Sequence, residues 1–109
     1  MKESHIQQQI CELLSKAGVF YFSIPNERWG ISHAQRTSLK KMGLTPGMPD
    51  LCIIHDGRPY FLEVKTDIGG LSEGQERMIK ILLLKGVKVS VVRSLSEAEK
   101  ILKTWKVLR

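Results

Sequence analysis

The chain has 109 residues, 42% of them hydrophobic, which is enough for the core of one small domain spanning residues 1–109 but not of two. Its 17 Lys and Arg against 11 Asp and Glu give a formal net charge of +6, which favours a polyanionic partner without establishing one. There is no apolar leader, no stretch of membrane-spanning length and no cysteine pair at metal-ligand spacing, so we expect a cytoplasmic protein without a membrane partner.

The first part of the chain predicts a helix followed by a strand. Apolar residues recur at helical spacing over residues 4–17, and Gly18 is a typical helix stop. Residues 19–24 are mostly aromatic or β-branched, which favours a strand. Within the less regular segment 26–48, Ser32 begins a capping-box motif, which predicts a short helix there followed by a loop rich in glycine and proline.

The middle of the chain predicts a β-hairpin. Residues 50–54 and 60–66 both have strand character. Asp56 and Gly57 lie between them and form the dipeptide that tight hairpin turns favour. We therefore expect the two strands to pair in antiparallel fashion.

The last part of the chain predicts a helix, a strand and a second helix. Ser72 is expected to begin the first helix and Gly86 to end it. Its predicted apolar side consists of Met78, Ile79, Leu82 and Leu83. Residues 87–92 are almost continuously apolar, which predicts a central strand, and Ser96 is expected to cap the last helix. The order of elements predicts an α/β layer structure with a mixed sheet.

The hairpin carries the residues with the clearest potential for chemistry. Glu63 and Lys65 are two positions apart in a strand and therefore share a face, whereas Leu62 and Val64 point the other way. Pairing of the two strands can bring Asp50 near Glu63. Two carboxylates at close range repel each other, and a divalent cation such as Mg²⁺ removes that conflict. The alternative is a surface-exposed Glu-x-Lys on an edge strand, with Asp50 as an ordinary turn residue.

Two segments at this point resemble the PD-(D/E)xK nuclease superfamily and, more narrowly, the virus-type replication–repair nuclease (VRR-NUC) domain. They are residues 47–51, Gly-Met-Pro-Asp-Leu, and residues 61–66, Phe-Leu-Glu-Val-Lys-Thr. Further segments match in the family's order: Glu3 with Gln7, Pro25-Asn26-Glu27, Leu71-Ser72-Glu73-Gly74-Gln75 and Val91-Val92-Arg93-Ser94. The resemblance covers essentially the whole chain and implies a restriction-endonuclease-like αβββαβ core, with a mixed central sheet flanked by helices.

The resemblance also implies roles for individual residues. Asp50 and Glu63 would bind Mg²⁺ or Mn²⁺ with help from the Val64 carbonyl, and Lys65 would be the catalytic lysine. Glu3 would be an additional acidic ligand, direct or through water, although a carboxylate in the first turn of a helix is favourable in any case. Gln75 would contact a metal-bound water or the scissile phosphate, although its spacing from Ser72 also fits a capping box.

The substrate implied by these matches is DNA. Arg28, Arg36, Lys40 and Lys41 are candidates for phosphate contacts; otherwise they form a solvated basic face. A bare nuclease domain without a sequence-reading module favours recognition of DNA shape, and a two-fold dimer suits a four-way junction. We therefore expect a homodimeric Holliday-junction resolvase, with a dimer surface in segment 26–48 or on the helix that begins at Ser72.

Three other functions stay open from the sequence alone. The first is a nuclease for flaps, nicks or other branched DNA, or a restriction-like nuclease that depends on a partner. The second is a non-catalytic DNA-binding module that keeps the nuclease fold. The third is a small structural or regulatory protein, which predicts no affinity for DNA at moderate salt.

Overall fold

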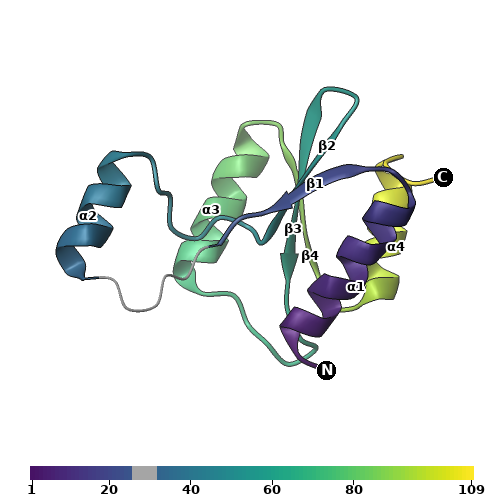
Figure 1. Ribbon diagram of the computed structural model, residues 1–109, viewed down its shortest axis with the longest axis horizontal. Helices are drawn as coiled ribbons and strands as arrows, with labels where there is room; N and C mark the ends of the chain where they lie inside the picture. Colours follow the sequence, from purple (N-terminus) through teal and green to yellow (C-terminus); the bar gives the residue numbers. More distant parts are fainter. Residues whose placement is uncertain (26–31) are drawn as a thin grey trace.

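The computed structural model describes residues 1–25 and 32–109, and these residues form helices on both faces of a four-stranded sheet (Figure 1). In chain order the elements are α1 (Glu3–Lys16), β1 (Phe20–Ser23), α2 (His33–Lys41), β2 (Leu51–His55), β3 (Arg58–Val64), α3 (Glu73–Leu84), β4 (Lys88–Val92) and α4 (Leu95–Thr104). No helix among the described residues is long and apolar enough to cross a membrane.

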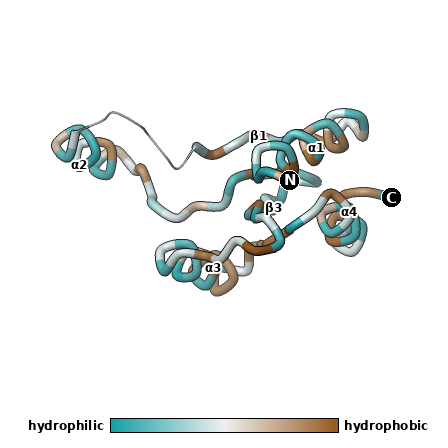
Figure 2. The backbone as a smooth tube through the Cα atoms, turned by 90° about the horizontal axis from the view of Figure 1, so that it is seen from below, coloured by the Kyte–Doolittle hydropathy of each residue, from teal (hydrophilic) through white to brown (hydrophobic). Residues whose placement is uncertain are grey.

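The sheet is mixed, as predicted. Its strand order is β1-β2-β3-β4, with antiparallel pairing up to β3 and parallel pairing between β3 and β4. Helix α3 lies on one face of the sheet, and α1 and α4 lie together on the other (Figure 1). Helix α2 stands apart from the sheet and from the other helices in both views of the backbone (Figures 1 and 2).

The main core lies between the sheet and the α1–α4 layer. The inward-facing residues of α1 recur at helical spacing, and those of β2 and β3 alternate along each strand. The fully buried members of this core, all at 0% exposure, are Ile10, Leu14, Leu51, Ile53, Leu62, Val64, Ala98 and Leu102. Burial of Leu62 and Val64 confirms the predicted alternation and leaves Glu63 on the opposite face.

Local signals in the sequence also placed the hairpin turn and two of the helix caps. Asp56 and Gly57 both have positive φ, 51° and 75°, as a tight hairpin turn of the predicted type requires. Ser32 and Ser72 each begin a helix with a complete capping box. These predictions succeed because each depends on residues only a few positions apart.

Three predictions about the C-terminal half are wrong. Strand β4 lies at the edge of the sheet and not at its centre; its apolar residues are covered by α3 on one face and α4 on the other. Ser94, not Ser96, caps α4, because a helix that begins at Leu95 packs that residue against the core. Leu83 is 53% exposed, whereas the other three residues of the predicted apolar side of α3 are half-buried.

Candidate active site

Residues from four elements converge at the end of the sheet opposite the β2–β3 hairpin (Figure 1). Asp50 immediately precedes β2 and Lys65 immediately follows β3. Gln75 lies in the first turn of α3, and Glu3 is the first residue of α1 on the other face of the sheet. Several loops and helix ends therefore meet where the predicted chemistry is located.

Asp50 is held against the end of β3. Leu51 pairs with Leu62 in the antiparallel ladder, so the preceding residue, Asp50, comes beside Glu63. The Asp50 carboxylate accepts a hydrogen bond of 2.7 Å from the Val64 backbone N–H, and its carbonyl accepts one of 2.8 Å from the Ile24 N–H. This network fixes both the backbone and the side chain of Asp50.

Glu63 is the one buried charged residue in the described part of the chain, with 1% exposure. This burial argues against the alternative of a surface-exposed Glu-x-Lys. The Gln75 side-chain amide donates to Glu63 Oε1 at 3.3 Å. The Gln75 side-chain oxygen also accepts from the Ser72 N–H at 2.9 Å, so Gln75 completes the capping box and contacts the site at once. The helix cap therefore fixes the amide that reaches Glu63.

The electrostatic environment of Glu63 disfavours its charged form. Burial and the neighbouring negative charge of Asp50 raise the pKa of Glu63 from 4.5 to about 8. The negative charge of Glu3 adds to this increase in pKa, and the positive charge of Lys65 opposes it. The charges of Glu3, Asp50 and Lys65 therefore all act on this one buried carboxylate.

The donor set fits a divalent cation. Glu63 Oε2 is buried and has no hydrogen-bond partner among the described residues, a costly state that a bound cation would relieve. Asp50 and Glu63 supply the one or two carboxylates that Mg²⁺ typically uses alongside water and phosphate. Residues 1–25 and 32–109 contain no group of three or more His, Cys, Asp or Glu able to hold a metal, so Glu3 as a direct third ligand stays a prediction.

The predicted phosphate contacts lie away from this centre. Arg36, Lys40 and Lys41 are exposed on α2, and no carboxylate of the described residues forms an ion pair with them. Arg28 lies outside the described residues, as do Asn26 and Glu27 of the predicted motif. The structure thus brings Asp50, Glu63, Val64, Lys65 and Gln75 together and leaves the basic helix as a separate surface.

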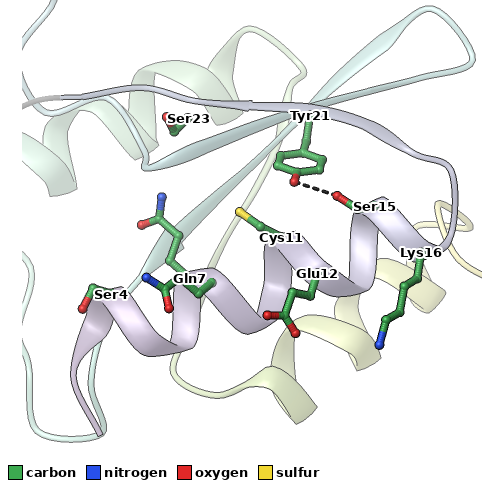
Figure 3. A pocket seen from close by; sticks show the side chains of 9 residues that line it. Ser4, Gln7, Cys11, Glu12, Ser15, Lys16, Tyr21 and Ser23 are labelled. Carbon is green, nitrogen blue, oxygen red and sulfur yellow. Dashed lines mark hydrogen bonds between the residues drawn. The ribbon is translucent and has the colours of Figure 1, made fainter.

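A groove runs between α1 and β1. Gln7, which the resemblance paired with Glu3, lines it together with Ser4 and Cys11 (Figure 3). The hydroxyls of Ser15 and Tyr21 form a hydrogen bond of 2.8 Å across it (Figure 3). Gln7 therefore lies on the α1 side of a groove whose other side is the edge strand β1.

Sequence reasoning did not identify Gly47 as part of the site. Gly47 has φ +84°, and a Cβ there would lie 2.5 Å from the Gly74 carbonyl oxygen and 3.3 Å from the Gln75 nitrogen. The loop that leads to Asp50 therefore packs directly on the first turn of α3. In the sequence Gly47 begins the Gly-Met-Pro-Asp-Leu segment, but that segment does not reveal this long-range contact.

Replacement of Gly47 should disturb the site. In Gly47→Ala the new methyl group displaces the Asp50 loop or the Gln75 turn, and we expect DNA cleavage to slow by about 10- to 100-fold. Gly18→Ala is the matched control, because Gly18 has a similar φ of +70° but nothing within 4 Å of an added Cβ. Gly18→Ala should lose about 1–2 kcal/mol of stability because of its positive φ alone, and Gly47→Ala should lose more, because its methyl group also meets the Gly74 backbone. Equal cleavage rates would contradict this role of Gly47.

The mixed sheet, with two carboxylates and a lysine at one end of a hairpin, has the arrangement expected of a nuclease of the PD-(D/E)xK type. A model of the VRR-NUC domain family matches residues 1–95, and the chain belongs to this family. The family is one of nucleases, which implies DNA as the substrate.

Two solved structures show the same fold. One, described as a VRR-NUC domain, is 23% identical and has a TM-score of 0.68, with 94% of this chain and 96% of that chain covered. The other, described as a VRR-NUC domain protein, is 18% identical and has a TM-score of 0.75, with 99% and 90% covered. The search of curated proteins finds no match.

Proposed function

We propose that the protein is a Mg²⁺- or Mn²⁺-dependent endonuclease that hydrolyses DNA phosphodiester bonds at the Asp50–Glu63–Lys65 site. The observation that carries this proposal is the buried Glu63 carboxylate, which lies beside Asp50 and has one oxygen without a hydrogen-bond partner among residues 1–25 and 32–109. Two adjacent carboxylates repel each other, and this repulsion opposes folding. A bound cation would remove the repulsion, which explains why both carboxylates lie at this position.

Each residue has a defined part in the proposed reaction. Asp50, Glu63 and the Val64 carbonyl would hold the cation, with Glu3 contributing directly or through water. When bound, a divalent cation polarises the phosphate and lowers the pKa of coordinated water. Lys65 orients the attacking water or stabilises negative charge that develops on the phosphate. Gln75 holds Glu63 in place by hydrogen bonding.

Bond cleavage then follows from the geometry of in-line attack. Water attacks the phosphorus, the 3′ oxygen leaves as a hydroxyl, and the product carries a 5′ phosphate. The Lys65 ammonium contributes most if it contacts the phosphate in the transition state rather than in the bound substrate. Loss of this amine should therefore reduce the cleavage rate more than DNA binding.

Branched DNA, in particular a four-way junction cut by a homodimer, is the substrate we favour. Support for a dimer comes from large apolar side chains left exposed, in part on the α3 helix where the sequence suggested an interface. These residues are Phe20, Phe22, Met42, Ile54, Ile81, Leu83 and Leu84. Phe20 and Phe22 form a tilted aromatic pair on β1, with ring centroids 6.3 Å apart. An exposed aromatic pair of this kind suits an interaction surface better than single scattered apolar residues do.

The substrate can be tested with labelled four-way junction, flap, nicked and linear DNA in Mg²⁺ or Mn²⁺. We expect paired incisions in the junction and a dimer in sedimentation experiments. Preferential cleavage of flaps or nicks would instead favour a nuclease for those DNA structures. A strict monomer on junction DNA would contradict paired incision. Tight DNA binding without cleavage in either metal would instead identify a non-catalytic binding module.

The basic face of α2 should contribute to DNA affinity but not to chemistry. Lys40→Ala combined with Lys41→Ala removes two exposed cations, so the dissociation constant for DNA should rise. The dependence of log K on log salt should become shallower by about 1 for each lost phosphate contact. Lys103→Ala is the control, because Lys103 is an exposed lysine of α4 that pairs with Glu99. An unchanged salt dependence would show that α2 does not contact the backbone.

A further inference from the structure

The turn at residues 66–69 determines where the Lys65 side chain can lie. It follows Lys65 directly, and the Gly69 N–H closes it by donating to the Thr66 carbonyl at 3.2 Å. A Cβ added at Gly69 would lie 3.7 Å from Lys65 Cδ, so the turn folds back against the aliphatic part of the lysine. A displacement of this turn would therefore move the Lys65 amine.

Arg93 holds this turn from the neighbouring strand. It follows β4 directly, and its guanidinium Nη1 donates to the carbonyl oxygens of Thr66 and Gly69, both at 2.6 Å. These two carbonyls lie at the two ends of the turn. Hydrogen bonds from a charged donor are shorter and stronger than neutral ones, which suits a contact that must fix a loop.

Arg93 is itself anchored on both sides. Its backbone N–H donates to Glu97 Oε1 at 2.8 Å, in the first turn of α4. The preceding carbonyl, of Val92, accepts a 3.0 Å hydrogen bond from the Lys65 N–H. Residues 92–93 thus form hydrogen bonds with the backbone of Lys65 and with the turn that follows it. Through Glu97 they are also bound to α4, which packs in the core.

We infer that Arg93 is a positioning residue that holds Lys65 in place through the 66–69 turn. This inference rests on the proposed function, in which the Lys65 amine acts on the phosphate. A guanidinium is always charged and its donors are rigidly placed, so it can bridge two carbonyls with little loss of freedom. Arg93 acts through Lys65 and does not itself contact DNA.

The test separates chemistry from binding. Arg93→Met should slow single-turnover cleavage of saturating four-way junction by about 10- to 100-fold, the effect expected when a reacting group is misplaced. Affinities for DNA and for Mn²⁺ should match those of the wild type. Arg93→Lys should recover part of the rate, because an ammonium can still donate to both carbonyls. Arg58→Met, at the hairpin end of β3, is the matched control and should cleave at the wild-type rate.

Several results would overturn the inference. One is a wild-type cleavage rate in Arg93→Met. Another is weaker DNA binding with a shallower salt dependence and an unchanged rate, which would make Arg93 a phosphate contact. If Arg93→Met does not fold, Gly69→Ala decides, because its methyl group would lie 3.0 Å from Thr66 Oγ1 and crowd the same turn. A severalfold slower rate supports the inference, and an unchanged rate overturns it.

The two proposals fail in different ways. A folded wild-type protein that cleaves no DNA in either metal overturns the proposed function, and this inference with it. A wild-type protein that cleaves DNA while the Arg93 and Gly69 variants cleave equally fast overturns the inference alone.

Discussion

Lys65→Met should lower the rate of DNA cleavage by about 100- to 10,000-fold while the protein remains folded and still binds Mn²⁺ and DNA. Methionine retains most of the aliphatic chain that packs near Gly69, but it lacks the amine. The carboxylates of Asp50 and Glu63 stay in place, so the cation site survives. Single-turnover cleavage combined with calorimetric titration of Mn²⁺ measures both properties on one preparation.

Lys88→Met is the matched control for this change. Lys88 is exposed at the start of β4 and pairs with Tyr60, far along the strand from Glu63. It should cleave at the wild-type rate. Equal cleavage by Lys65→Met and Lys88→Met would remove Lys65 from the mechanism, and loss of Mn²⁺ binding in Lys65→Met would assign the lysine to the structure of the metal site instead.

Glu63→Gln should abolish metal-dependent cleavage and yet stabilise the protein. The amide has nearly the same shape and can still accept the hydrogen bond from Gln75, but it carries no charge to bury. We expect Mn²⁺ affinity to fall more than about 100-fold. At pH 9 without metal the variant should be more stable by about 1–3 kcal/mol, as measured by urea denaturation.

The gain in stability should depend on pH in a defined direction. The pKa of Glu63 rises from 4.5 to about 8 on folding, so the folded state binds more protons than the unfolded state between these values. This contribution to the stability of the wild type is complete below pH 4.5 and is lost as the pH rises through 8. The difference between Glu63→Gln and wild type should therefore grow from pH 6 to pH 9. A constant difference would contradict the raised pKa of Glu63.

The hairpin shows how much of the site the sequence could predict. The Asp56-Gly57 turn and the two-residue period of a strand are local features, and together they put Glu63 and Lys65 on one face. The two carboxylates, Asp50 and Glu63, then suggested a binding site for a divalent cation. The burial of Glu63 was not local information, because it depends on residues distant in the chain, among them Asp50 and Gln75.

The errors arose where local patterns allow two solutions. An apolar strand must be covered on both faces, but helices alone can do this, as they do for β4. Ser94 and Ser96 are each followed three residues later by a glutamate, so spacing cannot choose between them. The contacts made by Gly47 and Arg93 join distant segments, and no periodicity in the sequence reveals them.

The most direct test of the central claim compares wild-type protein with Asp50→Asn on one labelled four-way junction in Mg²⁺ and in Mn²⁺. The carboxamide keeps an oxygen to accept the Val64 N–H but loses the charge that a cation requires. The wild type should produce cuts with 5′ phosphates in the presence of metal and none with chelator, and Asp50→Asn should produce none. Absence of cleavage by the folded wild type in either metal, or equal cleavage by Asp50→Asn, would contradict a metal-dependent nuclease site at Asp50 and Glu63.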